Sequence, residues 1–200
     1  MNTTVYLLRH GRVENPSGVL YGTLPGFPLS EVGRRQINNL AEELKRSGVK
    51  ILSVVSSPAL RARETAEIVA RAFGLPSVQI EERIGEWGMG RWVGGSVKEF
   101  KERSGYYGEP MRFDGLEPLR ELAKRVQEAI DQYRQKFAGG SVLLVSHREP
   151  LVAALLSLQN RSWEEIHDTD FPVASVWEIV YTDAGEIASI KKVFDHHADP

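Results

Sequence analysis

The side chains best suited to chemistry are two histidines and four arginines that follow short apolar runs of the sequence. They are His10, His147, Arg9, Arg12, Arg61 and Arg148. A neutral imidazole is a competent nucleophile near neutral pH, and arginine forks match the oxygens of a phosphoryl group. Arginines stay charged and favour the unprotonated form of a nearby imidazole. These residue types together predict phosphoryl transfer to a histidine.

Each of these residues also has a plainer interpretation. A single histidine at a strand end is often only a hydrogen-bonded structural residue, and a single arginine is usually a solvated charge. Carboxylates offer partners for a structural ion-pair network, and the candidates are Glu14, Glu64, Glu86 and Glu149. Gathering so many cations without an anion is unfavourable, however. A binding site for a phosphate ester is therefore the favoured hypothesis.

Three apolar runs must position these side chains. Residues 4–8, 51–55 and 142–145 are short and almost continuously apolar, which predicts buried strands of a parallel sheet. In open α/β sheets, ligands bind beyond the carboxyl ends of the strands. The strands run, in order, into Arg9-His10-Gly11, Ser56-Ser57-Pro58 and Ser146-His147-Arg148. All three groups are therefore expected at one edge of one sheet.

Helical patterns separate the strands. Periodic apolar residues predict helices over 33–45, 60–73, 119–137 and 150–158, the first of them capped by Ser30. Two further strands, 175–181 and 187–194, flank a turn at 183–185 and predict a hairpin. This alternation predicts a three-layer α/β fold with an antiparallel pairing at its end. Residues 82–115 break the rhythm, and we interpret them as an irregular lid over the site.

Composition narrows the classes of function. A net charge of -2 gives no overall attraction to nucleic acid or to an anionic membrane, so an anionic ligand needs a local cationic cluster. The absence of Cys excludes thiol catalysis. No leader or membrane-spanning run is visible, so a cytoplasmic location is expected. No metal site and no cofactor are expected; the predicted partner is a small-molecule phosphate ester, and a homodimer through the C-terminal hairpin stays open.

Four motifs resemble, in order, the signatures of the histidine phosphatase superfamily, the phosphoglycerate mutase-like proteins. The first is Arg9-His10-Gly11, followed by Asn15 and by Tyr21-Gly22-Thr23 in a loop. The second is Ser56-Ser57-Pro58 with Arg61. The third is Arg83-Ile84-Gly85-Glu86, and the fourth is Val145-Ser146-His147. Any one triplet is weak evidence, but four in order on the expected elements are specific.

The resemblance implies a single histidine phosphatase domain over residues 1–200, with its lid at about 82–115. It implies a three-layer α/β/α sandwich around a mostly parallel six-stranded sheet with one antiparallel strand. It also implies a phosphohistidine intermediate on His10, formed without a metal. In that chemistry Arg9, Arg61 and His147 hold the phosphoryl group, Glu86 protonates the leaving oxygen, and the substrate-binding candidates are Asn15, Gly22, Thr23 and Arg148.

Three places depart from the family pattern. Val13 replaces a usual polar residue, and Gly115-Leu116-Glu117-Pro118 replaces a common Gly-Glu-Ser. Arg148 stands where the family usually has Gly. Its guanidinium either clamps a second anionic group of the substrate or folds back onto Glu149 or Glu86, and both alternatives stay open.

The motifs favour phosphomonoester hydrolysis, with two alternatives. A cofactor-dependent phosphoglycerate mutase shares every catalytic residue, and Arg112 and Arg148 would then hold a substrate carboxylate. Against it, the segment between Glu86 and His147 is short, whereas the family's mutases carry a longer insertion there. The third hypothesis is a non-catalytic phosphate-binding or interaction module with an exposed aromatic surface, formed by Trp87, Trp92, Tyr106 and Tyr107. Aromatic and apolar residues of the lid are also candidates to line a leaving-group pocket; these are Trp92, Tyr106, Tyr107, Met111 and Phe113. The alternative, favoured for most of them, is that these side chains only pack the lid onto the edge of the sheet.

Overall fold

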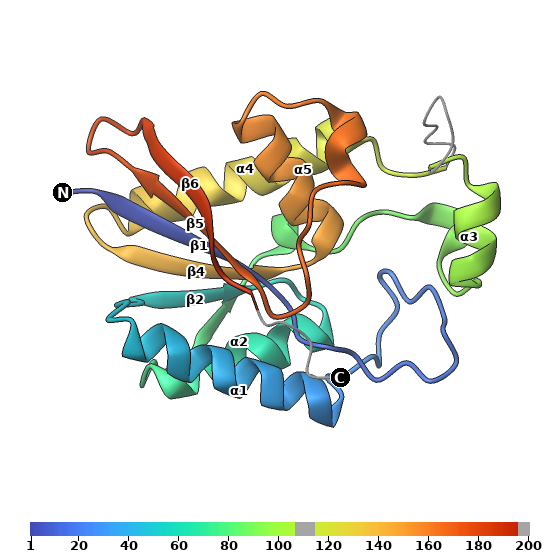
Figure 1. The fold of residues 1–200 in the computed structure, drawn as a ribbon, viewed down its shortest axis with the longest axis horizontal. Coiled ribbons are helices and arrows are strands. Elements are labelled where there is room, and N and C mark those ends of the chain that lie inside the picture. Colours follow the sequence, from blue (N-terminus) through green and yellow to red (C-terminus); the bar gives the residue numbers. More distant parts are fainter. Residues whose placement is uncertain (107–114, 196–200) are drawn as a thin grey trace.

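The computed structural model describes residues 1–106 and 115–195, which form a six-stranded sheet between helices (Figure 1). Across the sheet the strand order is β3-β2-β4-β1-β5-β6. The strands are β1 (Thr3–Arg9), β2 (Ser53–Ser56), β3 (Val78–Ile80), β4 (Ser141–Ser146), β5 (Val176–Tyr181) and β6 (Ile187–Phe194). Strands β1 to β4 are parallel, and β5 is antiparallel to both of its neighbours. The predicted mostly parallel sheet with one antiparallel strand is confirmed.

Helices cover both faces of the sheet, because its central strands are apolar on both sides. The long helices are α1 (Glu31–Arg46), α2 (Leu60–Ala72), α4 (Leu119–Lys136) and α5 (Arg148–Leu158). Figure 1 shows α1 and α2 on one face and α4 and α5 on the other. Alternate residues of β1 follow this division: Tyr6 and Leu8 belong to the core under α1 and α2, and Val5 and Leu7 to the core under α4 and α5. The predicted three layers are therefore present.

The helix ends lie within two residues of the predicted positions. Ser30 caps α1 as predicted, and its hydroxyl accepts a hydrogen bond from the N–H of Gly33. Helix α5 begins at Arg148, two residues before the predicted start, with His147 at the N-cap. Pro150 still lies in the first turn, where its missing N–H costs no hydrogen bond. His147 is therefore held between the end of a strand and the start of a helix.

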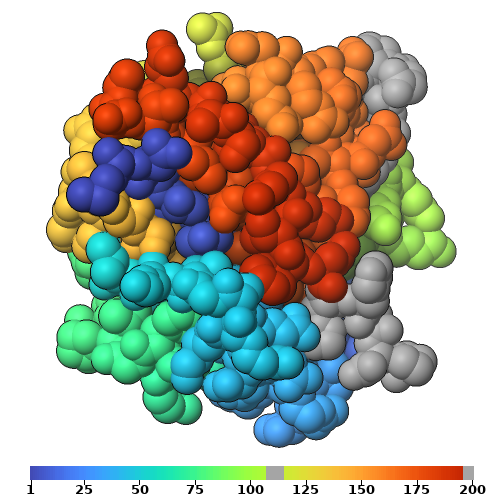
Figure 2. All heavy atoms as spheres, turned by 60° about the vertical axis from the view of Figure 1, so that its left-hand side comes forward, coloured from blue at the N-terminus to red at the C-terminus, as the bar shows by residue number. Residues whose placement is uncertain are grey.

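The two edges of the sheet differ in how well the sequence predicts them. The C-terminal hairpin of β5 and β6 forms as predicted, and the C-terminal strands lie beside the N-terminal strand on the surface in Figure 2. Strand β3 forms the other edge and has three residues, too few for an apolar pattern to predict. None of the described helices is long and apolar enough to cross a membrane.

Residues 82–106, which we call the wall segment, hold more structure than the predicted irregular lid. They contain the short helices η1 (Glu82–Ile84), η2 (Gly90–Trp92) and α3 (Val97–Arg103). Ser96 caps α3 by accepting hydrogen bonds from the N–H groups of Lys98 and Glu99. Short elements joined by glycines have no long periodic pattern, which is why the sequence predicts only a loop here.

The aromatic side chains of the wall segment face inward. Trp87 and Tyr106 are fully buried, with ring centres 4.7 Å apart, and Phe100 lies 6.3 Å from Trp87. They belong to the same core as Leu122 of α4. The predicted exposed aromatic surface is therefore wrong for Trp87 and Tyr106, because their apolar area packs the segment onto the domain. The candidates Tyr107, Met111, Arg112 and Phe113 lie outside the described residues.

Candidate active site

The two histidines meet at the carboxyl ends of the adjacent parallel strands β1 and β4. Arg9 is in register with Ser146, so the next residue on each strand is His10 and His147 respectively. The N–H of His10 donates to the carbonyl of Ser146 at 3.1 Å. The ring centres lie 5.2 Å apart with planes at 62°. Sheet register therefore brings together residues that are far apart in the sequence, and both rings are almost completely buried.

The backbone around His10 fixes which ring nitrogen is free to react. Its Nδ1 lies 2.8 Å from the carbonyl oxygen of Gly11, which can only accept, so Nδ1 carries the proton and Nε2 keeps its lone pair. A Cβ at Gly11 would lie 2.8 Å from the carbonyl oxygen of Gly33, so only glycine fits between β1 and α1. The ring is thus held in one tautomer, with Nε2 available as a nucleophile.

Burial is the main cause that lowers the pKa of His10 well below its usual 6.5, and the charges of His147, Arg61 and Arg9 lower it further. The hydrogen bond to Gly11 opposes this only in part. The pKa of His147 is also lowered, first by burial and then by Arg61 and Arg9. Both imidazoles are therefore neutral at neutral pH, the state that a nucleophile requires.

Glu86 lies against both His147 and Arg61. Its Oε2 is 3.2 Å from Nδ1 of His147 and 2.9 Å from Nη2 of Arg61. Its Oε1 accepts from the N–H of Trp87 at 2.9 Å. On the other side of the His147 ring, Nε2 lies 2.7 Å from the hydroxyl oxygen of Ser57. A carboxyl group, an imidazole and a guanidinium therefore converge within hydrogen-bond distances beside His10.

Two of the predicted arginines are buried with the histidines. Arg61, in the first turn of α2, is 1% exposed, donates to the carbonyl of Gly22 at 2.9 Å and stacks on Tyr21 at 4.5 Å. Arg9 donates to the carbonyl of Phe171 at 2.7 Å, and burial lowers its pKa. In the described parts of the chain, Nδ1 of His147 has no partner beyond its 3.2 Å contact with Glu86, and Nε of Arg9 and Nε of Arg61 are buried N–H donors without a hydrogen-bond partner. Such donors suit the oxygens of an anion. We call Arg9, His10, Arg61 and His147 the cationic floor.

Arg12 does not join the cationic floor. Its side chain is exposed, and its backbone N–H donates to the side chain of Gln36 at 3.2 Å. The expectation that all four arginines emerge into the site is therefore wrong for Arg12, because the chain has left the strand and turned toward α1.

A cavity of about 180 Å³ opens onto His10. Arg9, Tyr21 and Glu86 also line it. Its sides are largely apolar and come from two loops and α3, with Leu20, Met89, Val97 and Phe100. Further charged side chains line the same cavity, namely Lys101, Arg148 and Glu149. The cavity combines an anion-binding base with apolar walls, the usual composition of a small-molecule site.

The three loop residues expected to bind substrate have different environments. Asn15 lines the cavity and also closes its own loop, exchanging hydrogen bonds with the backbone of Val19 at 2.9 and 3.1 Å. Gly22 lines the cavity, has a positive φ of 43° and gives its carbonyl to Arg61. Thr23 is exposed and lines a separate cavity of about 450 Å³.

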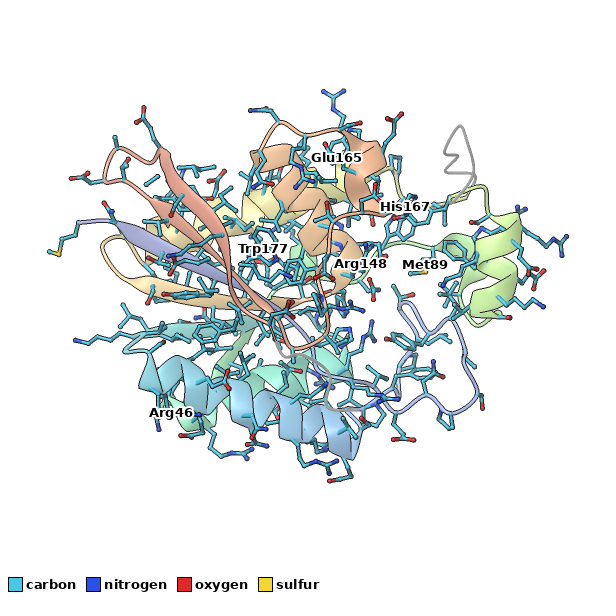
Figure 3. All side chains as sticks on the ribbon, in the orientation of Figure 1. Arg46, Met89, Arg148, Glu165, His167 and Trp177 are labelled. Atoms are coloured by element: carbon cyan, nitrogen blue, oxygen red, sulfur yellow. The ribbon has the colours of Figure 1, made fainter. Side chains whose placement is uncertain are left out.

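Arg148 folds back onto the protein. Its Nη2 donates to the carbonyl oxygens of Ile166 at 2.8 Å and Thr169 at 3.1 Å, and Nη1 lies 3.2 Å from a carboxylate oxygen of Glu149. Figure 3 shows Arg148 at the start of α5 beside the segment that contains His167, whose carbonyl is a third, longer contact at 3.4 Å. Of the two alternatives, the geometry has the one in which Arg148 pairs with Glu149.

Several residues that contact the site were not singled out. Ser57 lies within a recognised motif, and its contact with His147 depends on the pairing of β2 with β4. Tyr21 is adjacent to a predicted residue, but nothing in the sequence reveals its stacking on Arg61. Arg125 of α4 donates to the backbone carbonyl of Glu86 at 3.0 Å and carried no signal beyond its charge. The described residues include no cluster of three or more metal-ligating side chains.

Comparison with known proteins identifies the family of this arrangement. The family model described as "Histidine phosphatase superfamily (branch 1)" matches residues 5–193. The chain belongs to the histidine phosphatase superfamily. The predicted resemblance is therefore confirmed, and the strand-end histidine, the buried arginines and Glu86 occupy one site of a superfamily member.

Relatives and solved structures agree with this assignment. The chain is 32% identical over 188 residues to the 2,3-bisphosphoglycerate-dependent phosphoglycerate mutase of Thermoplasma acidophilum, covering 92% of this chain and 90% of that protein. It is 34% identical over 163 residues to phosphoserine phosphatase 1 of Hydrogenobacter thermophilus, covering 76% and 74%. Among solved structures, Bacillus stearothermophilus YhfR matches with a TM-score of 0.81 and 25% identity, covering 92% of this chain and 94% of that one.

Proposed function

We propose that this member of the superfamily is a phosphatase that hydrolyses small phosphate monoesters through a phosphohistidine on His10, without a metal ion. The observation that carries the proposal is a neutral, buried imidazole with a free Nε2, adjacent to buried arginines and a carboxyl group. We further propose that residues 1–200 act as a single cytoplasmic domain, and that residues 82–106, from the predicted lid at about 82–115, form one side of the site.

In the first step, Nε2 of His10 attacks phosphorus in line with the ester oxygen. The Nε2–P bond forms as the P–O bond to the leaving group breaks. Arg9 and Arg61 offer their partnerless Nε–H donors to the equatorial oxygens, and His147 lies beside them. Glu86, in its acid form, gives its proton to the departing oxygen.

In the second step, water replaces the leaving group. Glu86, now a carboxylate, accepts a proton from the water as its oxygen attacks phosphorus, and the Nε2–P bond breaks. Phosphate leaves, and His10 returns to its neutral state. One carboxyl group thus serves as acid and then as base, for which its placement next to both Arg61 and His147 is suited.

Phosphoglycerate mutase activity is the second candidate, because a relative of that name aligns with 92% of this chain. Both functions use the same transfer to His10, and they differ in whether the phosphoryl group then passes to water or back to a sugar acid. Interconversion of 2- and 3-phosphoglycerate, measured with and without a bisphosphate primer, separates them. Hydrolysis without interconversion supports the phosphatase.

The deciding experiment measures phosphate release from p-nitrophenyl phosphate and a panel of metabolite monoesters in EDTA. The wild-type protein and an Arg12→Ala control, whose side chain is exposed, should be equally active. His10→Ala should lose activity by on the order of 10³-fold or more. A phosphoryl group bound covalently to the wild-type protein, labile in acid and absent from His10→Ala, would identify the phosphohistidine. Inactivity toward every ester, or full activity of His10→Ala, would contradict the proposal.

A further inference from the structure

The guanidinium of Arg125 donates hydrogen bonds to the backbone of the wall segment around Glu86 and to the carboxylate of Glu117. Its Nη1 donates to the carbonyls of Arg83 and Gly85 at 2.7 and 2.9 Å, and Nη2 donates to the carbonyl of Glu86 at 3.0 Å. Nε and Nη2 also donate to the two carboxylate oxygens of Glu117 at 2.7 and 3.0 Å. A fork with all these partners fixes direction as well as charge.

Glu117 holds the same segment just after Glu86. Its Oε2 accepts from the N–H of Gly88 at 3.0 Å, and its own N–H donates to the carbonyl of Gly88 at 2.7 Å. Its carbonyl accepts from the indole N–H of Trp87 at 2.8 Å. Burial acts to raise the pKa of Glu117, but hydrogen bonds from Arg125 and Gly88 outweigh it, and the pKa is lowered. Glu117 therefore remains a carboxylate that anchors residues 87–88 ahead of α4.

Regular backbone structure does little to place Glu86. It lies between η1 and η2, outside the strands of the sheet. Besides the N–H of Trp87, its carboxylate contacts Arg61 and His147 of the cationic floor. In the proposed reaction these two residues bind the phosphoryl group. A general acid must lie within hydrogen-bond reach of the leaving oxygen. A displacement of about 1 Å is enough to lower a rate about 10²-fold.

We propose that Arg125 and Glu117 are positioning residues that hold Glu86 where it protonates the leaving group. The proposal rests on the phosphatase function proposed above. Neither side chain lines the cavity that contains His10, so neither contacts a substrate bound there. Arg125 lines a second cavity that Glu86 also lines, and its charge contributes to the lowered pKa of His147, but its hydrogen bonds all go to the segment that carries Glu86 and to Glu117. This predicts a specific signature, because a poor leaving group such as an alkoxide needs a proton, whereas p-nitrophenolate departs without one.

The test compares kcat/KM for p-nitrophenyl phosphate, phenyl phosphate and an alkyl phosphate, because kcat/KM reports the steps up to transfer onto His10. In Arg125→Gln the alkyl ester should lose at least about tenfold more than p-nitrophenyl phosphate, in the same direction as Glu86→Gln. Arg125→Lys should recover part of the loss. Arg134→Gln is the matched control, because Arg134 lies on the same helix and pairs with Asp131 away from the site. It should leave all three rates unchanged.

Equal losses of Arg125→Gln on all three esters would overturn the proposal, since they would indicate general damage to the fold. If Arg125→Gln does not fold, Glu117→Gln, which keeps the shape of the side chain, decides by the same leaving-group comparison. The two proposals fail in different ways. An inactive wild-type protein would contradict the proposed phosphatase. Equal losses of kcat/KM for all three esters in Glu86→Gln would contradict the role of Glu86 as the acid. If Glu86→Gln loses more kcat/KM for the alkyl ester than for p-nitrophenyl phosphate, whereas Arg125→Gln and Glu117→Gln lose the same for every ester, the phosphatase proposal stands and only the positioning role is contradicted.

Discussion

The cationic floor and the wall segment hold their functional side chains in different ways. His10 and His147 follow paired strands directly, so the register of a buried sheet fixes their separation. Glu86 comes from a segment without strands. Arg125 donates a hydrogen bond to the backbone carbonyl of Glu86, and the carboxylate of Glu117 accepts one from the N–H of Gly88. The floor therefore inherits its precision from strand pairing, whereas the position of Glu86 depends on side-chain contacts, namely the packing of its neighbour Trp87 into the core and the polar contacts of Arg125 and Glu117.

This difference suggests a division of labour between the two regions. The proposed nucleophile and phosphate ligands lie where a change would disturb the sheet, and they serve any phosphate ester. The apolar sides of the cavity, which include Met89, Val97 and Phe100, come from the wall segment. Residues there can change without disturbing the sheet, so the wall is where the choice among leaving groups is expected to lie.

The largest effect is expected in the floor, from Arg61→Ala. The substitution removes a buried guanidinium that contacts Glu86 and the carbonyl of Gly22. It also removes a cation from the position proposed for the equatorial oxygens. We expect kcat/KM to fall on the order of 10³-fold for every ester, irrespective of its leaving group. Steady-state kinetics on the ester series checks this. A loss confined to alkyl esters would show that Arg61 acts mainly on the protonation of the leaving group by Glu86.

The second prediction concerns stability and pH. Both floor histidines have a pKa well below 6.5 in the folded protein, whereas the unfolded chain takes up protons near 6.5. Below that pH the unfolded state binds more protons, so the free energy of unfolding should fall as pH decreases. The slope should reach about 1.4 kcal/mol per pH unit for each histidine.

Urea denaturation between pH 7.5 and pH 5 measures this slope. His147→Asn should reduce it by the contribution of one histidine, and replacement of both His10 and His147 should reduce it further. In the wild-type enzyme, kcat/KM should also hold steady through pH 6.5 and decline only below it, because His10 stays neutral. A slope that neither substitution changes would show that the buried imidazoles do not titrate as described.

The same two regions show how far the sequence predicts the molecule. The floor is predictable because short, almost continuously apolar runs identify β1 and β4, and ligand-binding residues are expected at the carboxyl ends of such strands, where His10 and His147 lie. Strand β3 is not predicted, because three residues are too few to show an apolar pattern. Arg12 was misplaced because strand-end position does not fix the direction of a side chain once the chain turns.

In the wall segment, the sequence predicts which residue carries the carboxyl group but not which residues hold it in position. Glu86 stands out by its motif, but the partners that position it come from α4 and are set by tertiary packing. The hypothesis of an interaction module requires Trp87 and Tyr106 on the surface, whereas they pack into the core with Leu122. Burial of such a segment depends on contacts between distant residues, which local pattern does not encode.

A smaller effect is expected in the wall, from Phe100→Ala. Phe100 is 4% exposed, lines the cavity and lies 5.7 Å from Trp92. Its loss removes apolar surface from the leaving-group side while leaving the floor in place. We expect KM for bulky esters to rise about tenfold, with kcat nearly unchanged. Inorganic phosphate, which lacks a leaving group, should inhibit as before. Equal weakening of phosphate and of bulky esters would place Phe100's influence in the floor.

The smallest effect on turnover is expected from Arg148→Met at the border of the two regions. Its guanidinium faces the carbonyls of Ile166 and Thr169, and losing it leaves these acceptors without a partner. We expect the free energy of unfolding to drop by about 2 kcal/mol, while kcat/KM changes less than about threefold. Comparing phenyl phosphate with 3-phosphoglycerate makes the test selective. A KM that rises about tenfold for phosphoglycerate alone would mean that Arg148 leaves its carbonyls to clamp a second anionic group, because only a direct contact with that group distinguishes the two esters.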